Sequence, residues 1–376
     1  MNFYRITSAL TLHSFKDPIG AVPILGISLK KHQEIFISLV NGKLIDIDDP
    51  SKIKESGEYF VFADDLFFSI AFLKKAIVAS KNKKSSLQFC LDKNIFNERY
   101  ILPHPNYSNE KYQFKFFYYK NKEEPKEHII EQNIYEYSVN IPSQIVAGGK
   151  YRMDMCDTFA SHIISPFHLL FTTLAQNLCR IDSKQKKIPR FLKENFGSPG
   201  TFWYYRALRK MNKFGKNCKI HPTAIIEGSE IGDNVFIGAN AVIRLSVLKN
   251  NCTVSDNVGV INSFLDEGTY IANCNYINSC VTYREVFLIH GPYQLSIFGE
   301  NSACFAVINC DIRLDQNTIK IPTSYGIIDS KQPILGIAYG HRSKAGGGNI
   351  IASGRIMPND YVLNPPDSII LNFEKK

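Results

Sequence analysis

Aliphatic residues recur at steps of six or five along the chain between residues 231 and 277. They are Ile231, Ile237, Ile243, Leu248, Val254, Val260, Leu265, Ile271 and Ile277. An α-helix repeats about every 3.6 residues and a strand about every two, so neither explains these steps. Three short strands and three turns in each coil of about eighteen residues, with one aliphatic side chain per strand pointing inward, do explain them. The segment is therefore predicted to be a parallel β-helix.

The residues between the aliphatic positions fit the same prediction. A second inward position, four residues after an aliphatic one, has to be small or β-branched, and these positions hold Val235, Ala241, Val247 and Val258. Gly, Asn and Asp tolerate left-handed backbone angles and are expected at the turns. The turns of the first coils hold Gly232, Asp233, Asn234, Gly238 and Asn240.

The start of the repeat carries a family resemblance. Ile220-His221-Pro222-Thr223-Ala224, followed by Ile231-Gly232 and Ile237-Gly238, resembles the hexapeptide-repeat family. The resemblance implies a left-handed parallel β-helix, predicted over residues 217–372. It also implies a homotrimer, since the flat faces of these helices pack around a threefold axis.

The period is not kept along the whole of this region. Over residues 286–299 no simple period remains, and we expect irregular coils there. Residues 311–333 are expected to form a loop, and residues 335–370 to close the β-helix. Nine cysteines without a Cys-x-x-Cys pair indicate reduced structural thiols rather than a disulfide framework or a zinc ribbon.

A helical, basic connector is predicted over residues 156–216. Asp157-Thr158 is expected to cap a helix running from Phe159 to Leu178, with a kink or a restart at Pro166. A second helix is expected after the break at residues 197–200, capped by Thr201. Its basic face suits either packing on the β-helix or an amphipathic surface for acidic partners.

Positive charge is concentrated in this connector. Residues 180–219 hold twelve basic and two acidic residues, whereas the whole chain has a net charge of +9. A field of this kind attracts phosphate groups. We expect a phosphate-bearing small molecule or an acidic carrier or partner protein there, and we do not expect nucleic acid. A solvated linker is the alternative.

The first 155 residues are predicted to form an α/β module, with strands at 36–40 and 59–63 and a helix at 67–79. The segment Tyr59 to Phe68 resembles the Gly-Asp-Asn-Leu-Phe-Phe pattern of sugar-phosphate nucleotidyltransferases. That resemblance implies that Asp64 binds the divalent metal of a nucleotide. No glycine precedes Gly20, so the Gly-rich loop that holds the triphosphate in this family is missing. We therefore expect a degenerate module without nucleotidyltransferase activity, with Mg²⁺ needed only if the module is active.

Acyl transfer needs a general base, usually a histidine, and the β-helix region offers two candidates. His290 lies in the irregular stretch, where a loop interrupting the coil is expected to carry function. His341 is the second candidate, and His221 is expected to be structural. Gly346 and Gly347, with Arg342 before them, are the expected site for the pantetheine arm and phosphates of coenzyme A, although a tight corner and turn histidines explain these residues as well. The histidines are too sparse for the three-histidine zinc site of the γ-type carbonic anhydrases.

These features lead to one functional hypothesis and one alternative. We expect a hexapeptide-repeat acyltransferase-like protein that moves an acyl group from acetyl-coenzyme A or another acyl-coenzyme A to a sugar or sugar nucleotide. The alternative is a non-catalytic scaffold or regulatory subunit. No run of about 18 apolar residues is present and the first residues do not resemble a secretory signal, so we expect a cytoplasmic protein.

Overall fold

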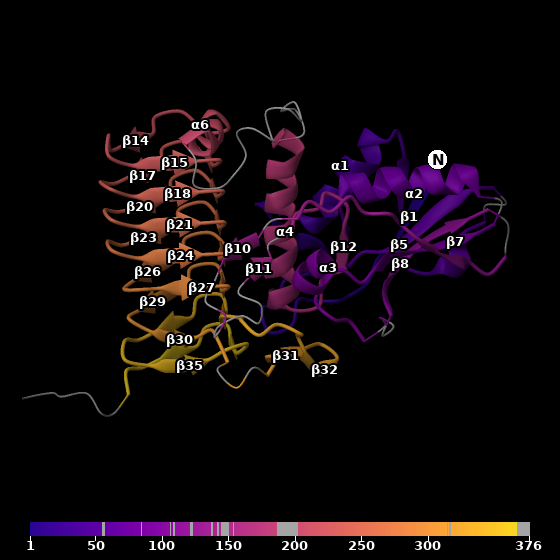
Figure 1. The fold of residues 1–376 in the computed structure, drawn as a ribbon. Helices are drawn as coiled ribbons and strands as arrows, with labels where there is room; N and C mark the ends of the chain where they lie inside the picture. The colour runs from indigo at the N-terminus through magenta and orange to yellow at the C-terminus, as the bar shows by residue number, and fades with distance from the viewer. Residues whose placement is uncertain are drawn as a thin grey trace, which may run out of the picture. The chain divides into compact units, whose positions relative to one another are not determined.

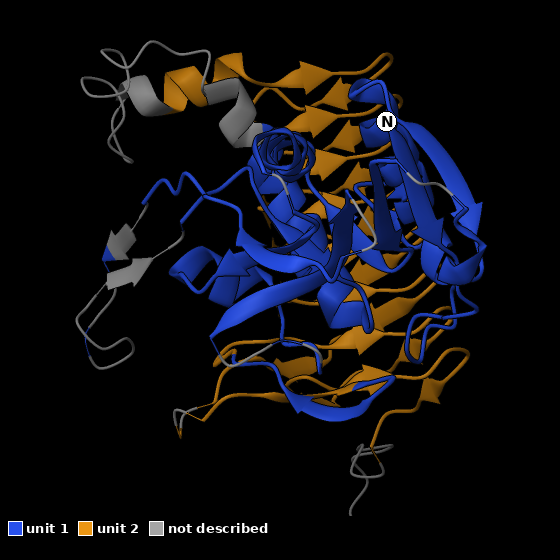
Figure 2. Cartoon of the chain, turned by 90° about the vertical axis from the view of Figure 1, so that its right-hand side faces the viewer, with its two compact units in different colours: residues 1–190, 323–331 blue, residues 191–322, 332–376 orange. Residues whose placement is uncertain are grey.

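The computed structural model describes most of the chain in two compact units, shown in blue and orange in Figure 2. One unit comprises residues 1–190 and 323–331, and the other comprises residues 191–322 and 332–376. The described residues are 1–54, 57–83, 85–105, 107, 110–120, 123–136, 138–140, 143, 150–152, 154–185, 202–313, 315 and 317–366.

The first unit is built on a six-stranded mixed sheet with the strand order β4-β1-β5-β8-β7-β9. Strands β4, β1 and β5 are parallel to one another, and β8 is antiparallel to both β5 and β7. The inward faces are apolar and mostly aromatic, as in the stack of Phe3 on Phe60. The strands span Asn2–Ile6 (β1), Lys43–Ile47 (β4), Tyr59–Ala63 (β5), Leu87–Asp92 (β7), Lys111–Tyr119 (β8) and Lys126–Ile129 (β9).

Helices of the first unit begin where a polar residue caps their free amides. Ser28 accepts a hydrogen bond from the Lys31 amide at the start of α1 (Leu29–Leu39), and Ser69 accepts one from the Phe72 amide at the start of α2 (Ile70–Asn82). The strand predicted at 36–40 is wrong, because residues 36–39 form the end of α1 and Val40 is its C-cap. The predicted strand at 59–63 is confirmed as β5.

The predicted helix from Phe159 begins later than expected. Residues Ala160–His162 form strand β12, which pairs antiparallel with β6 (Leu66–Phe68), and α4 runs over Pro166–Gln185. Proline lacks an amide hydrogen and is tolerated in the first turn of a helix, so Pro166 starts the helix instead of kinking it. The same pairing shortens the predicted helix 67–79, because its first residues belong to β6.

Shorter elements complete the first unit. They are η1 (Ile19–Ala21), β2 (Pro23–Ile24), β3 (Ile27–Ser28), η2 (Pro50–Lys52), α3 (Ile95–Tyr100), β10 (Ser138–Asn140) and β11 (Lys150–Arg152).

The second unit is a parallel β-helix, as predicted, and Figure 1 shows its coils stacked from α6 downward. Each face is one parallel sheet. Face A contains β13 (Lys213–Phe214), β16 (Glu230–Ile231), β19 (Val247–Leu248), β22 (Phe264–Leu265), β25 (Val281–Thr282), β28 (Ile297–Phe298), β33 (Ala338–Tyr339) and β36 (Ile356–Met357). Face B contains β14 (Lys219–Ile220), β17 (Phe236–Ile237), β20 (Thr253–Val254), β23 (Tyr270–Ile271), β26 (Phe287–Ile289), β29 (Ala303–Phe305), β34 (Lys344–Ala345) and β37 (Val362–Leu363). Face C contains β15 (Ile225–Glu227), β18 (Val242–Arg244), β21 (Gly259–Ile261), β24 (Tyr276–Asn278) and β27 (Tyr293–Gln294).

The first coils are seventeen residues long, one fewer than predicted. Ile220 pairs with Ile237, and Ile231 pairs with Leu248. The predicted inward positions Val235, Ala241, Val247 and Val258 are all buried. The coil length is shorter than predicted because one of the three turns has one residue less than the six-residue repeat requires.

The irregular coils expected over residues 286–299 are regular in the structure. Strands β26, β27 and β28 keep the parallel register, but Ile277 pairs with Tyr293, sixteen residues later. This coil is one residue shorter again, at the corner between faces B and C. The change in spacing explains why no simple period was visible in the sequence.

The loop expected over 311–333 contains structure as well. It includes the hairpin strands β31 (Lys320–Thr323) and β32 (Gly326–Asp329), after which the helix resumes with β33. Before and after this insertion, β30 (Ile308–Cys310) pairs with β35 (Ile350–Ala352). No helix within the described part of the chain is long and apolar enough to cross a membrane.

Candidate functional site

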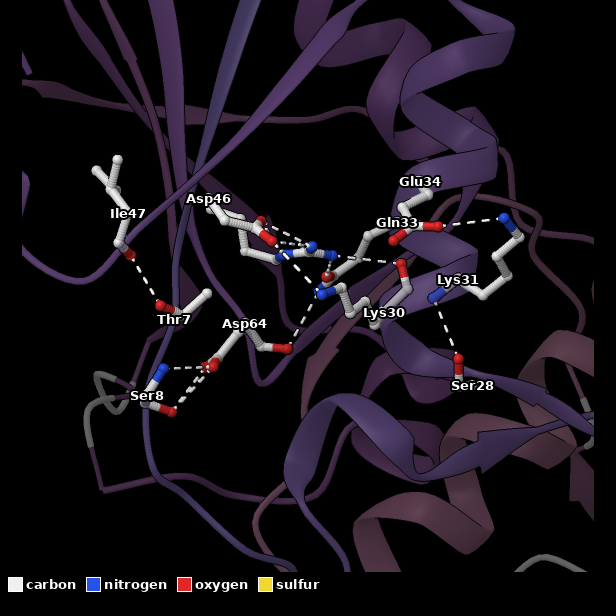
Figure 3. A network of polar contacts seen from close by, with 11 residues as sticks. Thr7, Ser8, Ser28, Lys30, Lys31, Gln33, Glu34, Asp46, Ile47 and Asp64 are labelled. Carbon is white, nitrogen blue, oxygen red and sulfur yellow. Dashed lines mark hydrogen bonds and ion pairs between the residues drawn. The ribbon is translucent and has the colours of Figure 1, made fainter.

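Asp64 stands where the sequence predicted it, at the carboxyl end of β5 (Figure 3). Its two carboxylate oxygens accept hydrogen bonds from Ser8, which follows β1: the Ser8 amide donates to Oδ2 at 2.6 Å and the hydroxyl donates to Oδ1 at 2.9 Å. Burial raises the pKa of Asp64, and the hydrogen bonds from Ser8 act against this rise. The carboxylate thus holds the segment that follows β1.

A network beside Asp64 satisfies the neighbouring polar groups. Arg5 is buried and donates to both carboxylate oxygens of Asp46, at 2.8 and 2.9 Å. Arg5 also donates to Gln33 at 3.0 Å, and Gln33 donates to the carbonyl oxygen of Asp64 at 3.2 Å. Arg5 therefore neutralises Asp46, which lies on β4. Both oxygens of Asp64 accept hydrogen bonds from Ser8, and Asp46 is already paired, so these residues do not fit a Mg²⁺ site at Asp64. We derive no step through a metal there.

A second polar cluster, which sequence analysis missed, lies in the first unit. Asp65, His104 and His162 are all buried. Each offers one oxygen or nitrogen atom that could bind a metal, and these three atoms lie within 4.8 Å of one another. The imidazole rings of His104 and His162 have centroids 4.9 Å apart, and Tyr325 contacts His104 edge-on at 5.4 Å. Two histidines and one carboxylate form a ligand set that suits divalent metals such as zinc.

The hydrogen bonds of His162 show how the cluster is held together. The Lys115 amide donates to Nε2 of His162 at 3.2 Å, so Nδ1 is the ring nitrogen that donates. Nδ1 donates to Asp65 Oδ1 at 3.0 Å. The cluster is thus held as a buried histidine–aspartate pair with His104 packed on it. Its residues come from three separate segments, which is why no sequence spacing indicated it.

His290 lies at the corner between faces B and C and is exposed to solvent. Its φ of 55° is left-handed, as are the φ angles of Asn240, Asn257 and Cys274 at the same corner of earlier coils. The predicted position in an interrupting loop is wrong, because His290 occupies a regular turn. Its role as a base stays a prediction that rests on its exposure.

His341 lies at a different corner, between faces A and B. Its side chain takes part in a pattern seen in several coils, in which a corner residue accepts a hydrogen bond from the backbone of the coil before it. His341 Nδ1 accepts from the Glu300 amide at 2.8 Å, as Asn250 Oδ1 accepts from the Asp233 amide. The position two residues after an inward residue is the sequence signal for this pattern. The structure therefore does not bring His290 and His341 together at one site.

Gly346 and Gly347 are tightly packed against neighbouring chain segments. A Cβ on Gly346 would lie 2.9 Å from both the Leu363 carbonyl oxygen and Pro365, and one on Gly347 would lie 3.2 Å from the Phe305 carbonyl oxygen. Arg342, at the other corner, is engaged with both carboxylate oxygens of Asp360 at 2.5 and 2.8 Å. Gly346, Gly347 and Arg342 therefore do not form a binding site for coenzyme A. Close packing explains why glycine occupies the first two positions.

The predicted basic helix is present as α6 (Phe202–Lys210), and its cap residue Thr201 lies outside the described residues, as do Lys186, Lys187, Arg190 and Lys193. A pocket of about 510 Å³ lies between α6 and face C. It is lined by Tyr205, Arg206, Arg209, Ile225, Glu227 and Arg244. The sequence predicted the charge of α6 but gave no sign of Glu227 and Arg244, because strand pairing across coils brings them to the helix.

Comparison with known proteins bears mainly on the β-helix. Residues 213–244 match a family model described as bacterial transferase hexapeptide, six repeats, which covers less than half of the chain. The matched residues form the first coils described above. No curated protein matches the chain.

Solved structures also match part of the chain. One is a Bacillus cereus protein titled "putative acetyltransferase", with 15% sequence identity. The match covers 38% of this chain and 78% of that protein, with a TM-score of 0.17.

Proposed function

We propose that the protein is an acyltransferase-like member of the hexapeptide class, which transfers an acyl group from an acyl-coenzyme A to a sugar or sugar nucleotide. The observation that carries the proposal is the match of residues 213–244 to a transferase hexapeptide model, on coils that form a regular parallel β-helix. Both features belong to the second unit, and the first unit is not needed for the proposal.

His290 is the proposed general base. An exposed neutral imidazole can take the proton from an acceptor hydroxyl or amine as the oxygen or nitrogen attacks the thioester carbonyl. The carbon–sulfur bond then breaks, and the proton passes to the departing thiolate. His341 is the second candidate, although its Nδ1 already accepts a hydrogen bond from the backbone.

The test is release of free coenzyme A from acetyl-coenzyme A in the presence of amino sugars and sugar nucleotides. We expect His290→Ala to lower the rate by about a hundredfold or more, with an unchanged thermal midpoint. His221→Ala is the matched control, since His221 is an exposed corner histidine held locally by Thr223. Equal rates for the wild type and both variants would remove His290 from the mechanism, and absence of turnover with every acceptor would overturn the acyltransferase proposal.

The alternative is a non-catalytic scaffold or regulatory subunit. It is favoured by Asp64, whose carboxylate holds Ser8 instead of facing an open nucleotide site. This alternative predicts no turnover and no loss of function in His290→Ala, while charge reversal of surface residues would abolish binding of a partner protein.

Self-association into a homotrimer is also proposed. The outer side of face B carries a row of partly exposed aromatic side chains, in which Tyr270 contacts Phe287 at 5.1 Å and Phe287 contacts Phe305 at 5.9 Å. Contiguous exposed apolar surface is typical of interaction sites. Sedimentation equilibrium is expected to give three times the mass of one chain, and Tyr270→Glu is expected to lower it. A monomer at all concentrations would contradict the proposal.

A further inference from the structure

We propose that the pocket between α6 and face C binds the phosphate group of a small organic phosphate. The residues that carry the inference are Arg209, Arg244, Glu227 and Tyr205, all within the second unit. The pocket lies at a different place on the β-helix from the corner histidines, and the choice of coenzyme A and sugar nucleotides as candidate ligands rests on the proposed function.

A buried carboxylate organises the pocket. The side chain of Glu227 is 2% exposed, and it accepts hydrogen bonds from Nε of Arg244 at 2.7 Å and from Nε of Arg209 at 3.3 Å. Each guanidinium thus uses its inner nitrogen on Glu227. Among the described residues, neither arginine donates a hydrogen bond from its terminal Nη atoms. These two atoms are the paired donors of a guanidinium that fit the oxygens of a phosphate.

Glu227 does not balance the charge of the arginines that it holds. Arg209 and Arg244 both bind its single carboxylate, which leaves one positive charge in excess among these three side chains. One arginine is enough to neutralise Glu227, so a purely structural link between α6 and face C does not need both. A phosphate monoester carries about two negative charges at neutral pH and complements this excess.

Preorganisation favours binding at this place. The guanidinium of Arg244 lies over the ring of Tyr205, 5.4 Å from its centroid, which holds the flat group from a second side. Because α6 is joined to the first coil by backbone hydrogen bonds, such as that from the Gly228 amide to the Leu208 carbonyl at 2.9 Å, its arginines are held on the same frame as Arg244. Side chains that are already fixed lose less entropy when a ligand binds.

The size of the pocket indicates more than a bare phosphate ion. A volume of about 510 Å³ lies in the range of small-molecule sites, and Ile225 adds an apolar wall. Sugar nucleotides and coenzyme A both carry a diphosphate on a body of this kind. Both compounds would be recognised through an organic phosphate group, and the experiment distinguishes a sugar nucleotide from coenzyme A.

The test is isothermal titration calorimetry of the full chain with pyrophosphate, uridine diphosphate, coenzyme A and uridine. Uridine diphosphate and pyrophosphate are expected to bind and uridine is not; binding of coenzyme A but not of uridine diphosphate would assign the site to that source. Arg209→Gln and Arg244→Gln are each expected to weaken binding about tenfold or more, since each removes a charge-assisted contact. Lys210→Gln removes the same charge from α6 outside the pocket, and we expect a change of less than about twofold.

Two outcomes would overturn the inference. One is no binding of any phosphate compound at low ionic strength, and the other is equal weakening by Lys210→Gln and Arg209→Gln, which would indicate a diffuse field. Arg209→Lys keeps the charge and guards against misfolding: it is expected to bind more tightly than Arg209→Gln and less tightly than the wild type. Loss of binding in these variants with unchanged acetyl transfer would separate this site from the proposed acyltransferase activity.

Discussion

Buried histidines set the acid sensitivity of the first unit. Burial lowers the pKa of His104 to about 3 and that of His168 to about 4. His168 is held by the hydroxyl of Ser165 at 2.9 Å and by the Pro103 carbonyl at 3.1 Å. Both rings are therefore neutral in the folded protein at pH values where the same side chains are charged in the unfolded chain, whose histidine pKa is about 6.5.

We predict that the first unit loses stability as the pH falls below about 6.5, because the unfolded chain then binds protons that the folded chain does not. Between pH 7 and pH 5, each of the two histidines should lower the free energy of unfolding by about 1–2 kcal/mol. The measurement is urea denaturation followed by hydrogen–deuterium exchange of peptides from the first unit.

A variant of His168 tests the assignment. His168→Gln should lower by about one the number of protons taken up on unfolding, and the slope of the unfolding free energy against pH should fall accordingly. This holds whatever the effect of the substitution on stability at pH 7. His221→Gln, at an exposed corner, should leave the slope unchanged. A slope that is the same in the wild type and His168→Gln would contradict the assignment.

The thiols are predicted to divide by burial. Of the nine cysteines, Cys274 and Cys310 are exposed and Cys218 is half-buried, whereas Cys252, Cys280 and Cys304 lie in the core of the β-helix. Burial raises the pKa of Cys280 to about 12. A thiol reagent should therefore label Cys274 and Cys310 rapidly in the native protein and the core cysteines only after unfolding. Cys274→Ser with Cys310→Ser should remove the rapid phase, and rapid labelling that persists would show that the coils open.

At the scale of elements, corner geometry explains the β-helix better than strand propensity does. Residues such as Asn240 and Asn257 hold left-handed φ angles at one corner of successive coils, and their side chains hydrogen-bond across coils at 3.3 Å. Where the corner lost one residue, His290 took the left-handed position. Such shortening changes the period from seventeen to sixteen without breaking the register, so periodicity alone could not show that the coils continue.

We predict that Glu227→Gln weakens the attachment of α6 to the first coil. The variant leaves Arg209 and Arg244 without their shared carboxylate, but both arginines are more than a third exposed, so solvent limits the loss to about 1–3 kcal/mol. Hydrogen exchange in α6 should rise while exchange in the later coils stays unchanged. Glu285→Gln, at an exposed corner of the β-helix, is the control and should have no measurable effect. Unchanged exchange in α6 of the Glu227 variant would contradict the role of this pair.

At the scale of the whole molecule, the chain enters the first unit twice. Residues 323–331 return to it from the β-helix sequence, where Ser324 donates to the Ile164 carbonyl at 3.4 Å and Tyr325 covers His104. The first unit is therefore discontinuous, and a fragment that ends at residue 190 lacks part of it. The order of segments along the chain does not divide this protein into two consecutive pieces.

We predict that Tyr325→Ala destabilises the first unit by about 1 kcal/mol, through loss of the aromatic contact with His104. The measurement is again urea denaturation with peptide-resolved exchange. Ile327→Ala, on the same hairpin and 76% exposed, should have little effect. Equal effects of the two substitutions would show that the hairpin is held by its backbone and not by Tyr325.

The sequence by itself determined the β-helix, because inward aliphatic residues at steps of five and six allow no helix or flat sheet. It also located the strand before Asp64, since a run of apolar residues ending in acid is a local signal. Tertiary structure alone decided the rest: Phe36 to Leu39 became helix because they continue α1, which Ser28 caps, and Ala160 became strand because β6 pairs with it. Partners from distant segments also decided what Asp64, His341 and Glu227 bind, since hydrogen bonds across coils and strands depend on proximity in space, which local patterns do not encode.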